Sequence, residues 1–100
     1  MGRNQSPPFF MEIQEEEMKI TVIGSHLCPD TLYALNRLYE AGVEVSFQDI
    51  LSCHEVLRTY LHIRETSELY AGIRGTQRLG VPCFRREDGS MTLDLNEILG

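Results

Sequence analysis

Long apolar runs and clusters of Lys and Arg are both missing from this 100-residue chain. No segment approaches the roughly 20 apolar residues of a membrane-spanning helix, and no charged start followed by an apolar run marks a signal peptide. The formal net charge is −6, with 9 basic against 15 acidic residues. Because nucleic-acid-binding domains usually carry a basic face, this balance argues against nucleic acid. The sequence therefore predicts neither a nucleic-acid nor a membrane partner.

Cysteine is also scarce, with three residues at Cys28, Cys53 and Cys83. An odd number does not pair off into the disulfide framework of a secreted protein. In the reducing cytosol, a cysteine is catalytic or buried more often than it is disulfide-bonded. We therefore expect a cytoplasmic protein. No CxxC pair or regular Cys/His spacing indicates zinc, so no metal is expected.

The composition is that of one small domain, expected over residues 18–100. Residues 1–17 show no hydrophobic period, contain the breaker Ser6-Pro7-Pro8, and are expected to be a disordered leader. Residues 19–24 are near-continuously apolar, which predicts a central strand covered on both faces. Alternation over 43–48 predicts a second strand.

Between these strands, a helix is expected from Pro29 to about residue 41, ended by Gly42 in a left-handed conformation. Strand, helix and strand in this order predict a right-handed unit with parallel strands. The buried stripe of this helix is expected to hold Leu32, Leu35, Leu38 and Ala41.

Later elements follow from local signals. Ser52 and Glu55 are spaced as a capping box, which predicts a helix starting at Cys53. A short helical stretch is expected around 67–73. Asp88-Gly89 predicts a two-residue type I′ turn between strands over 83–87 and 90–93. Asp94 and Glu97 predict a last short helix. The expected fold class is α/β, a four-stranded mixed sheet with helices packed on its faces.

The junction of the first strand and first helix carries the main chemical signal. Pro29 is favoured at the first helical position, so Cys28 is expected at the N-cap. Unpaired backbone N–H groups and the positive helix end stabilise a thiolate there. Asp30 opposes this, whereas a protonated His26 would help. The alternative is an inert capping cysteine, but cysteine is not a preferred N-cap residue. The junction therefore predicts a reactive thiol.

Two motifs together resemble the thioredoxin-fold signature of an active-site cysteine facing a cis-proline. They are Cys28-Pro29-Asp30-Thr31 and Gly80-Val81-Pro82-Cys83-Phe84. Along with these motifs, the runs LHIRET (61–66), QRLGVPCF (77–84) and EDG (87–89) resemble a bacterial glutaredoxin-related family whose active site usually reads Cys-Pro-Asp-Cys. The resemblance covers residues 19–99 and implies a thioredoxin-like (glutaredoxin) fold.

The resemblance implies a thiol-disulfide oxidoreductase in which Cys28 attacks glutathione mixed disulfides or protein disulfides. Val81 would offer its backbone N–H and C=O to the substrate, and Pro82 would pack beside the thiol. Thr31 stands where relatives have a second cysteine, which implies a monothiol mechanism completed by glutathione or another thiol. Thr31 is expected to donate its O–H to the thiolate of Cys28.

Glutathione recognition departs from the family pattern, since no lysine stands in residues 25–27. Arg78 or Gln77 is a candidate for binding a glutathione carboxylate. Asp94 is either the equivalent of a family carboxylate or only a helix cap, and the cap is the preferred interpretation. Cys83 is expected to be buried and structural rather than a resolving thiol. The tyrosines interpreted as packing residues are Tyr33, Tyr60 and Tyr70.

Two other functions stay open at this point. One is a non-catalytic binding module that keeps the fold and uses Cys28 only as a cap. The other is an iron–sulfur cluster carrier, in which Cys28 would be one ligand in a dimer, although the usual Cys-Gly-Phe-Ser motif is absent. The expected oxidoreductase is a monomer whose partners are glutathione or protein thiols.

Overall fold

The strand at the centre of the sheet is β2 (Lys19–Gly24). It pairs in parallel with β3 (Glu44–Asp49) and antiparallel with β4 (Cys83–Arg85). A short strand, β5 (Met91–Thr92), pairs antiparallel with β4 and completes the order β3-β2-β4-β5. Both the four strands and their mixed directions confirm the sequence prediction.

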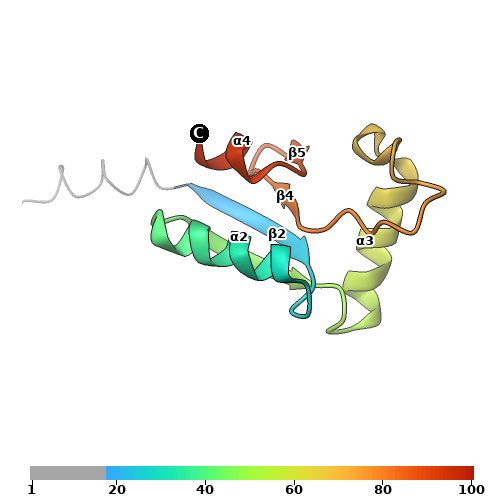
Figure 1. Ribbon diagram of the computed structural model, residues 1–100, viewed down its shortest axis with the longest axis horizontal. Helices are drawn as coiled ribbons and strands as arrows, with labels where there is room; N and C mark the ends of the chain where they lie inside the picture. The colour runs from blue at the N-terminus through green and yellow to red at the C-terminus, as the bar shows by residue number, and fades with distance from the viewer. Residues whose placement is uncertain (1–17) are drawn as a thin grey trace, which may run out of the picture.

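The computed structural model describes residues 18–100, so the leader expected over 1–17 lies outside the described residues. The helices are α2 (Pro29–Glu40), α3 (His54–Thr66), the 3₁₀ turn η1 (Glu68–Tyr70) and α4 (Leu95–Leu99). In Figure 1, α2 and α3 lie apart from each other, on either side of the strands. Among residues 18–100, no helix is long and apolar enough to cross a membrane.

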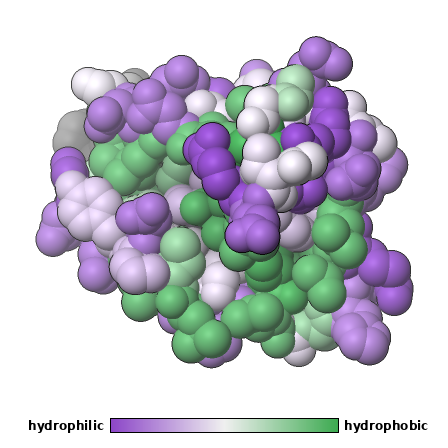
Figure 2. All heavy atoms as spheres, turned by 45° about the vertical axis from the view of Figure 1, so that its right-hand side comes forward, coloured by the Kyte–Doolittle hydropathy of each residue, from purple (hydrophilic) through white to green (hydrophobic). Residues whose placement is uncertain are grey.

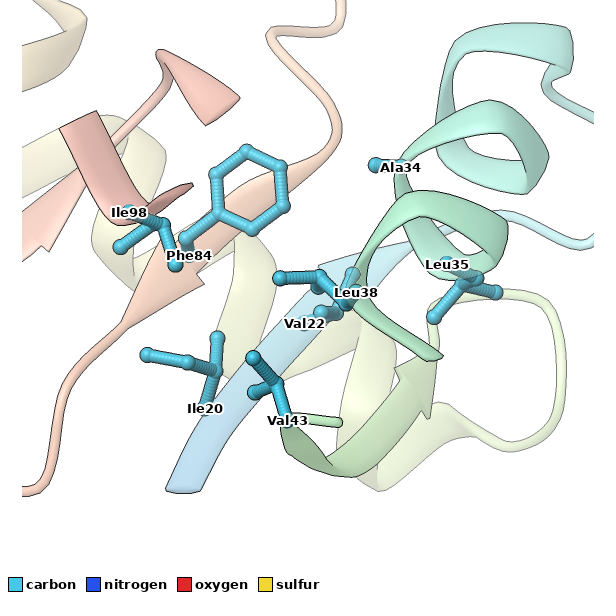
Figure 3. Close-up of a cluster of buried hydrophobic side chains, with 8 residues drawn as sticks. All are labelled: Ile20, Val22, Ala34, Leu35, Leu38, Val43, Phe84 and Ile98. Atoms are coloured by element: carbon cyan, nitrogen blue, oxygen red, sulfur yellow. The ribbon is translucent and has the colours of Figure 1, made fainter. Parts of the chain in front are cut away.

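Two hydrophobic clusters cover the two faces of the sheet. Successive residues of a strand point to opposite faces, and accordingly Val22 belongs to one cluster and Ile23 to the other. The first cluster joins the sheet to α2 and α4 (Figure 3) and contains Ile20, Val22, Ala34, Leu35, Leu38, Val43, Phe84 and Ile98. The second joins the sheet to α3 and η1 and contains Ile23, Ile50, Tyr60, Ile63, Tyr70, Ile73 and Cys83. The fold class is therefore α/β with helices packed on both faces.

The buried stripe of α2 differs from the predicted one. Leu32 is 45% exposed and Ala41 is exposed, whereas Ala34 is buried. Positions 32, 35, 38 and 41 are each three residues apart, and at 100° per residue such a row drifts around the helix. The face that meets the sheet follows the alternating spacing of three and four residues. The buried residues of α2 are Thr31, Ala34, Leu35 and Leu38.

The start of α3 also differs from the prediction. Its N-cap is Cys53 rather than Ser52, so the helix begins one residue later, at His54. Ser52 therefore stands one position before the N-cap, and its hydroxyl donates to the carbonyl oxygen of Asp49 at 2.7 Å. The predicted capping box with Glu55 is wrong, because the helix begins one residue later than that spacing requires.

The hairpin between β4 and β5 forms where Asp88-Gly89 predicted it, but with a longer loop and shorter strands. The N–H of Gly89 donates to Arg86 O at 3.0 Å, and the N–H of Arg86 donates to Ser90 O at 2.9 Å. Gly89 has φ +92. This is the three-residue form, a turn followed by a left-handed glycine, rather than a two-residue type I′ turn.

Of three further local signals, two are confirmed and one predicts too long a helix. Gly42 follows α2 with φ +77. Asp94 caps α4, because its carboxylate accepts the N–H of Asn96 at 2.9 Å. The helical stretch expected over 67–73 is reduced to the single turn of η1.

Residues 71–82 join η1 to β4 without helix or strand. The Val81–Pro82 peptide bond in this segment is cis, as the resemblance implied. Gly80 has φ +71, and a Cβ at this position would lie 2.5 Å from Cε2 of Tyr70. A glycine is therefore required here both by its backbone conformation and by the ring that packs against it.

We predict that Gly80→Ala destabilises the fold more than Gly75→Ala does. Gly75 also has positive φ, +83, but nothing lies within 4 Å of its Cβ position. The control therefore carries the cost of a left-handed alanine alone, about 1–2 kcal/mol. Overpacking against Tyr70 should add about 1–3 kcal/mol to the loss at Gly80. Urea unfolding of both variants measures this difference, and equal losses would contradict it.

Candidate functional site

Cys28 lies at the N-terminus of α2, directly after the loop that leaves β2. The N–H of Cys28 donates to Ser25 O at 3.0 Å, which closes a turn, and Pro29 occupies the first helical position. Cys28 is the N-cap residue, with φ −94 and ψ 119, and its thiol is half-buried. These observations confirm the predicted strand, loop and helix junction.

Thr31 joins the first turn of α2 to the end of β2. Its side chain is fully buried, and its Oγ1 accepts the N–H of Ser25 at 3.3 Å. A Cβ on Gly24 would lie 2.6 Å from this oxygen, so the glycine makes room for the threonine. In the part of the chain that the structure describes, Thr31 forms no hydrogen bond with Cys28. The observed contacts therefore make Thr31 a link between helix and strand.

Val81 and Pro82 lie at the same edge of the sheet as Cys28. Ile23 pairs with Cys83, so the chain leaving β2 and the chain entering β4 run side by side. Across residues 18–100, neither the N–H nor the carbonyl oxygen of Val81 forms a hydrogen bond with another residue. Val81 is half-buried. An unpaired backbone at the same sheet edge as a thiol can accept an extended ligand.

A groove of about 370 Å³ runs between the first half of α2 and the segments around β4 and α4. Its polar groups include Arg37, whose Nη1 donates to the hydroxyl of Tyr33 at 3.0 Å. The Arg37 guanidinium carbon also lies 5.9 Å from the centre of the Tyr33 ring. The groove is lined by Asp30, Tyr33, Ala34, Arg37, Val81, Pro82, Phe84, Leu93, Leu95 and Asn96. It therefore combines apolar walls with a cation that could bind a carboxylate.

No sequence motif marks Arg37, which is exposed on α2 and lines the groove. Arg78, the expected cation, is exposed and is not among the residues that line the groove. Tyr33, expected to pack, is 57% exposed and lines the groove instead. A signal was present, because Asp30, Tyr33 and Arg37 are spaced by three and four residues and share one helix face.

His26 ties the loop before Cys28 to the end of β3. Its Nδ1 lies 2.7 Å from Oδ2 of Asp49, and its N–H donates to Oδ1 of the same carboxylate at 3.4 Å. Leu51 N–H donates to that oxygen too, at 3.0 Å. Burial acts to raise the pKa of Asp49, but these hydrogen bonds outweigh it and hold the pKa below its ordinary value. An ionised carboxylate therefore fixes the loop.

Exposed leucines surround this edge of the sheet. Leu27 is 71% exposed, Leu51 52% and Leu79 53%, and they lie on the segments that leave β2, leave β3 and precede β4. Figure 2 shows apolar surface gathered in its lower part, where the loops after β2 and β3 lie in Figure 1. Large apolar side chains are therefore exposed at the sheet edge from which the loop to Cys28 leaves.

The other two thiols have opposite environments. Cys53 is exposed at the N-cap of α3, and a hydrogen bond from the N–H of Val56 is the main cause that lowers its pKa. Cys83 is buried, and this burial raises its pKa although contact with the Tyr70 hydroxyl acts the other way. Burial of Cys83 confirms the prediction. Tyr60 and Tyr70 are buried, as expected of packing residues.

No family model, no curated protein and no solved structure matches this chain. Within residues 18–100, no three His, Cys, Asp or Glu side chains form a group that could hold a metal ion. Geometry and chemistry alone therefore define the site. It combines a helix-capping thiol, an unpaired backbone segment and a groove with one arginine.

We predict that Thr31→Val destabilises the fold by about 1–3 kcal/mol, because the buried N–H of Ser25 would lose its acceptor. Valine keeps the shape of threonine and its contact with Gly24. The matched variant Thr31→Ser keeps the acceptor and removes a methyl group, which should cost about 1 kcal/mol. Urea unfolding of both variants tests this order. A larger loss for serine than for valine would show that packing, not the hydrogen bond, is the main contribution.

We predict that Asp49 stabilises the fold at neutral pH and loses this effect in acid. A carboxylate whose pKa is lower in the folded state stabilises it above the unfolded value, near 3.8, and stops doing so as pH falls through the folded value. The difference in unfolding free energy between wild type and Asp49→Asn should therefore be fully present above about pH 5 and shrink below about pH 4. Glu87→Gln, at an exposed position, is the control. A difference independent of pH would contradict the prediction.

Proposed function

We propose that this protein is a glutaredoxin-like thiol-disulfide oxidoreductase that acts through Cys28 by a monothiol mechanism. The observation that carries the proposal is the position of this thiol, at a helix N-cap and at the same sheet edge as the unpaired backbone of Val81. The strand order, the parallel β2–β3 pair, the antiparallel β2–β4 pair and the helices on both faces support a thioredoxin-like fold.

The helix N-terminus supports the reactivity of Cys28. In the described chain, the N–H groups of Asp30 and Thr31 donate to no backbone carbonyl, because Leu32 is the first residue of α2 whose N–H is bonded, to Cys28 O at 3.0 Å. Free N–H groups and the positive helix end stabilise an anion at the N-cap. A thiolate is the nucleophile in disulfide exchange, so this placement favours the reaction.

The proposed reaction proceeds in two exchanges. The Cys28 thiolate attacks the glutathione sulfur of a mixed disulfide R–S–S–G, a bond to Cys28 forms, and R–S⁻ leaves with the electron pair and takes a proton from water. A second glutathione thiolate then attacks the new mixed disulfide and releases the Cys28 thiolate with oxidised glutathione. The net result is that R–S–S–G and one glutathione become R–SH and oxidised glutathione.

An external thiol is required for the second exchange. Thr31 replaces the second cysteine of the family motif and is fully buried. Cys83 is 1% exposed, so its thiol is not accessible to a disulfide in solution. Glutathione is proposed as the co-substrate because the groove beside Val81 contains Arg37, which could bind one of its carboxylates. Val81 would pair with the glutathione backbone.

We predict that oxidised glutathione forms a mixed disulfide on Cys28. The experiment uses Cys53→Ser protein, because the exposed Cys53 would compete for the reagent. Mass spectrometry with peptide mapping should locate one glutathione on Cys28, and a further Cys28→Ser change should lower adduct formation about a hundredfold or more. Reduced glutathione should then release the protein thiol.

The control is the single Cys28→Ser variant, in which Cys53 should still react and Cys83 should stay protected until unfolding. Absence of an adduct on Cys28 in folded Cys53→Ser protein would contradict the proposed reaction. That result would leave a binding module in which Cys28 serves as a helix cap.

We predict that Arg37→Gln raises the KM for glutathione about tenfold, because a charge-assisted hydrogen bond to a carboxylate would be lost. Arg78→Gln is the rival variant, since the resemblance suggested Arg78 and the groove contains Arg37. Steady-state exchange at varied glutathione concentration distinguishes the two. A KM that rises in Arg78→Gln and not in Arg37→Gln would place the carboxylate elsewhere.

A further inference from the structure

Val81 lies near the end of the segment 71–82. Backbone-to-backbone hydrogen bonds within this segment occur only in its first half. Ile73 and Arg74 donate to Tyr70 O at 2.9 Å, and Thr76 donates to Ile73 O at 3.1 Å. From residue 77 to residue 82, no backbone N–H donates to a backbone carbonyl. Apart from the N–H of Arg78, which donates to Oγ1 of Thr76 at 3.0 Å, the hydrogen bonds to this second half come from side chains of α3 and η1.

Arg64 on α3 provides one such group, which bonds both halves of the segment. Its Nη2 donates to the carbonyl oxygens of Ile73, Thr76 and Arg78, at 3.3, 3.2 and 3.0 Å. The side chain is 15% exposed, and its buried Nε has no partner among the described residues. The guanidinium therefore bonds three carbonyl oxygens of the segment, although its own Nε donor has no partner in the described chain. Charged donors of this kind form the stronger hydrogen bonds.

Two tyrosines hold the residues directly before Val81. The hydroxyl of Tyr60 donates to Leu79 O, and that of Tyr70 donates to Gly80 O at 2.6 Å. Their rings pack edge to face, with centres 6.4 Å apart and planes at 82°. Burial raises the pKa of both tyrosines, so both hydroxyls stay protonated as donors near neutral pH.

The hydrogen bonds from the arginine and from the two tyrosines hold the same segment. Tyr60, Arg64 and Tyr70 come from α3 and η1, on the sheet face opposite α2 and Cys28. Every acceptor is a main-chain carbonyl between residues 73 and 80. The side chains of α3 and η1 therefore act on Val81 across the edge of the sheet.

We infer that Tyr60, Arg64 and Tyr70 are positioning residues for substrate binding: they fix the backbone of Val81 against which the disulfide substrate pairs. The inference rests on the proposed exchange function and adds residues that touch neither the substrate nor Cys28. Their loss should weaken substrate binding while the thiol keeps its intrinsic reactivity, because α2 and its N-cap are held by other contacts.

The experiment compares Tyr70→Phe, Tyr60→Phe, Arg64→Met and Arg64→Lys, all in the Cys53→Ser protein. The substrate is a mixed disulfide between glutathione and a short cysteine peptide. We expect KM to rise about threefold to tenfold in the two phenylalanine variants, and more in Arg64→Met than in Arg64→Lys, which keeps a charged donor. Cys28 alkylation by iodoacetamide should stay within about twofold of the parent rate.

Matched controls are Tyr39→Phe and Arg58→Lys, at exposed positions outside the groove and the loop. Both should keep the parent KM. In parallel, the backbone amide resonance of Val81 should shift in Tyr70→Phe and Arg64→Met but not in the controls.

Unchanged KM in the variants at Tyr60, Arg64 and Tyr70, with an unchanged Val81 resonance in Tyr70→Phe and Arg64→Met, would overturn the positioning role and leave the proposed function standing. A parallel loss of exchange and alkylation would also overturn it, because the effect would then be on the thiol or on folding. A parent protein that shows no exchange would refute the proposed function, and with it the role of Val81 as a substrate contact.

Discussion

The register between β2 and β4 is the constraint on which the site depends. Because Ile23 lies opposite Cys83 in an antiparallel pair, the end of one strand and the start of the other share an edge. The parallel partner β3 ends at this edge as well, with Asp49 opposite Gly24. A shift of one residue in the β2–β4 register would move Cys83 to the other face and separate Val81 from the loop that carries Cys28.

Much of the fold follows from the sequence because its signals are local. The apolar strand 19–24, the proline after Cys28 and the glycine after α2 each specify a backbone conformation within a few residues. The prediction was wrong where the exact start of a helix or its rotation against the sheet decides the outcome. Ser52 lies one position before the N-cap of α3, and positions 32, 35, 38 and 41, at a constant spacing of three, do not share the buried face of α2.

The site could be predicted only in part, because only some of its residues belong to a local sequence motif. Cys28 and the pair Val81–Pro82 are marked by sequence motifs, and the structure has them at one edge. Arg37 carries no motif, and its place in the groove depends on how α2 is rotated against the sheet. The roles of Tyr60 and Arg64 could not be predicted, since their partners are main-chain carbonyls 19 positions from Tyr60 and 9 to 14 positions from Arg64. A main-chain carbonyl is present at every residue, so no sequence pattern marks which one accepts a hydrogen bond.

The hydrogen bonds that Tyr60, Arg64 and Tyr70 donate to residues 73–80 are accepted by the main chain and not by side chains. Each of these bonds ends on a carbonyl oxygen, so the side chains of Arg78 and Leu79 take no part in them, whereas the hydroxyl of Thr76 itself bonds the main chain at Ile73 and Arg78. Those positions are exposed and stand close to Val81 in the chain. Positions 78 and 79 can therefore carry other side chains without loss of the main-chain contacts beneath them. A designed variant could present a different surface beside Val81 in this way while α2 and its capping cysteine stay unchanged.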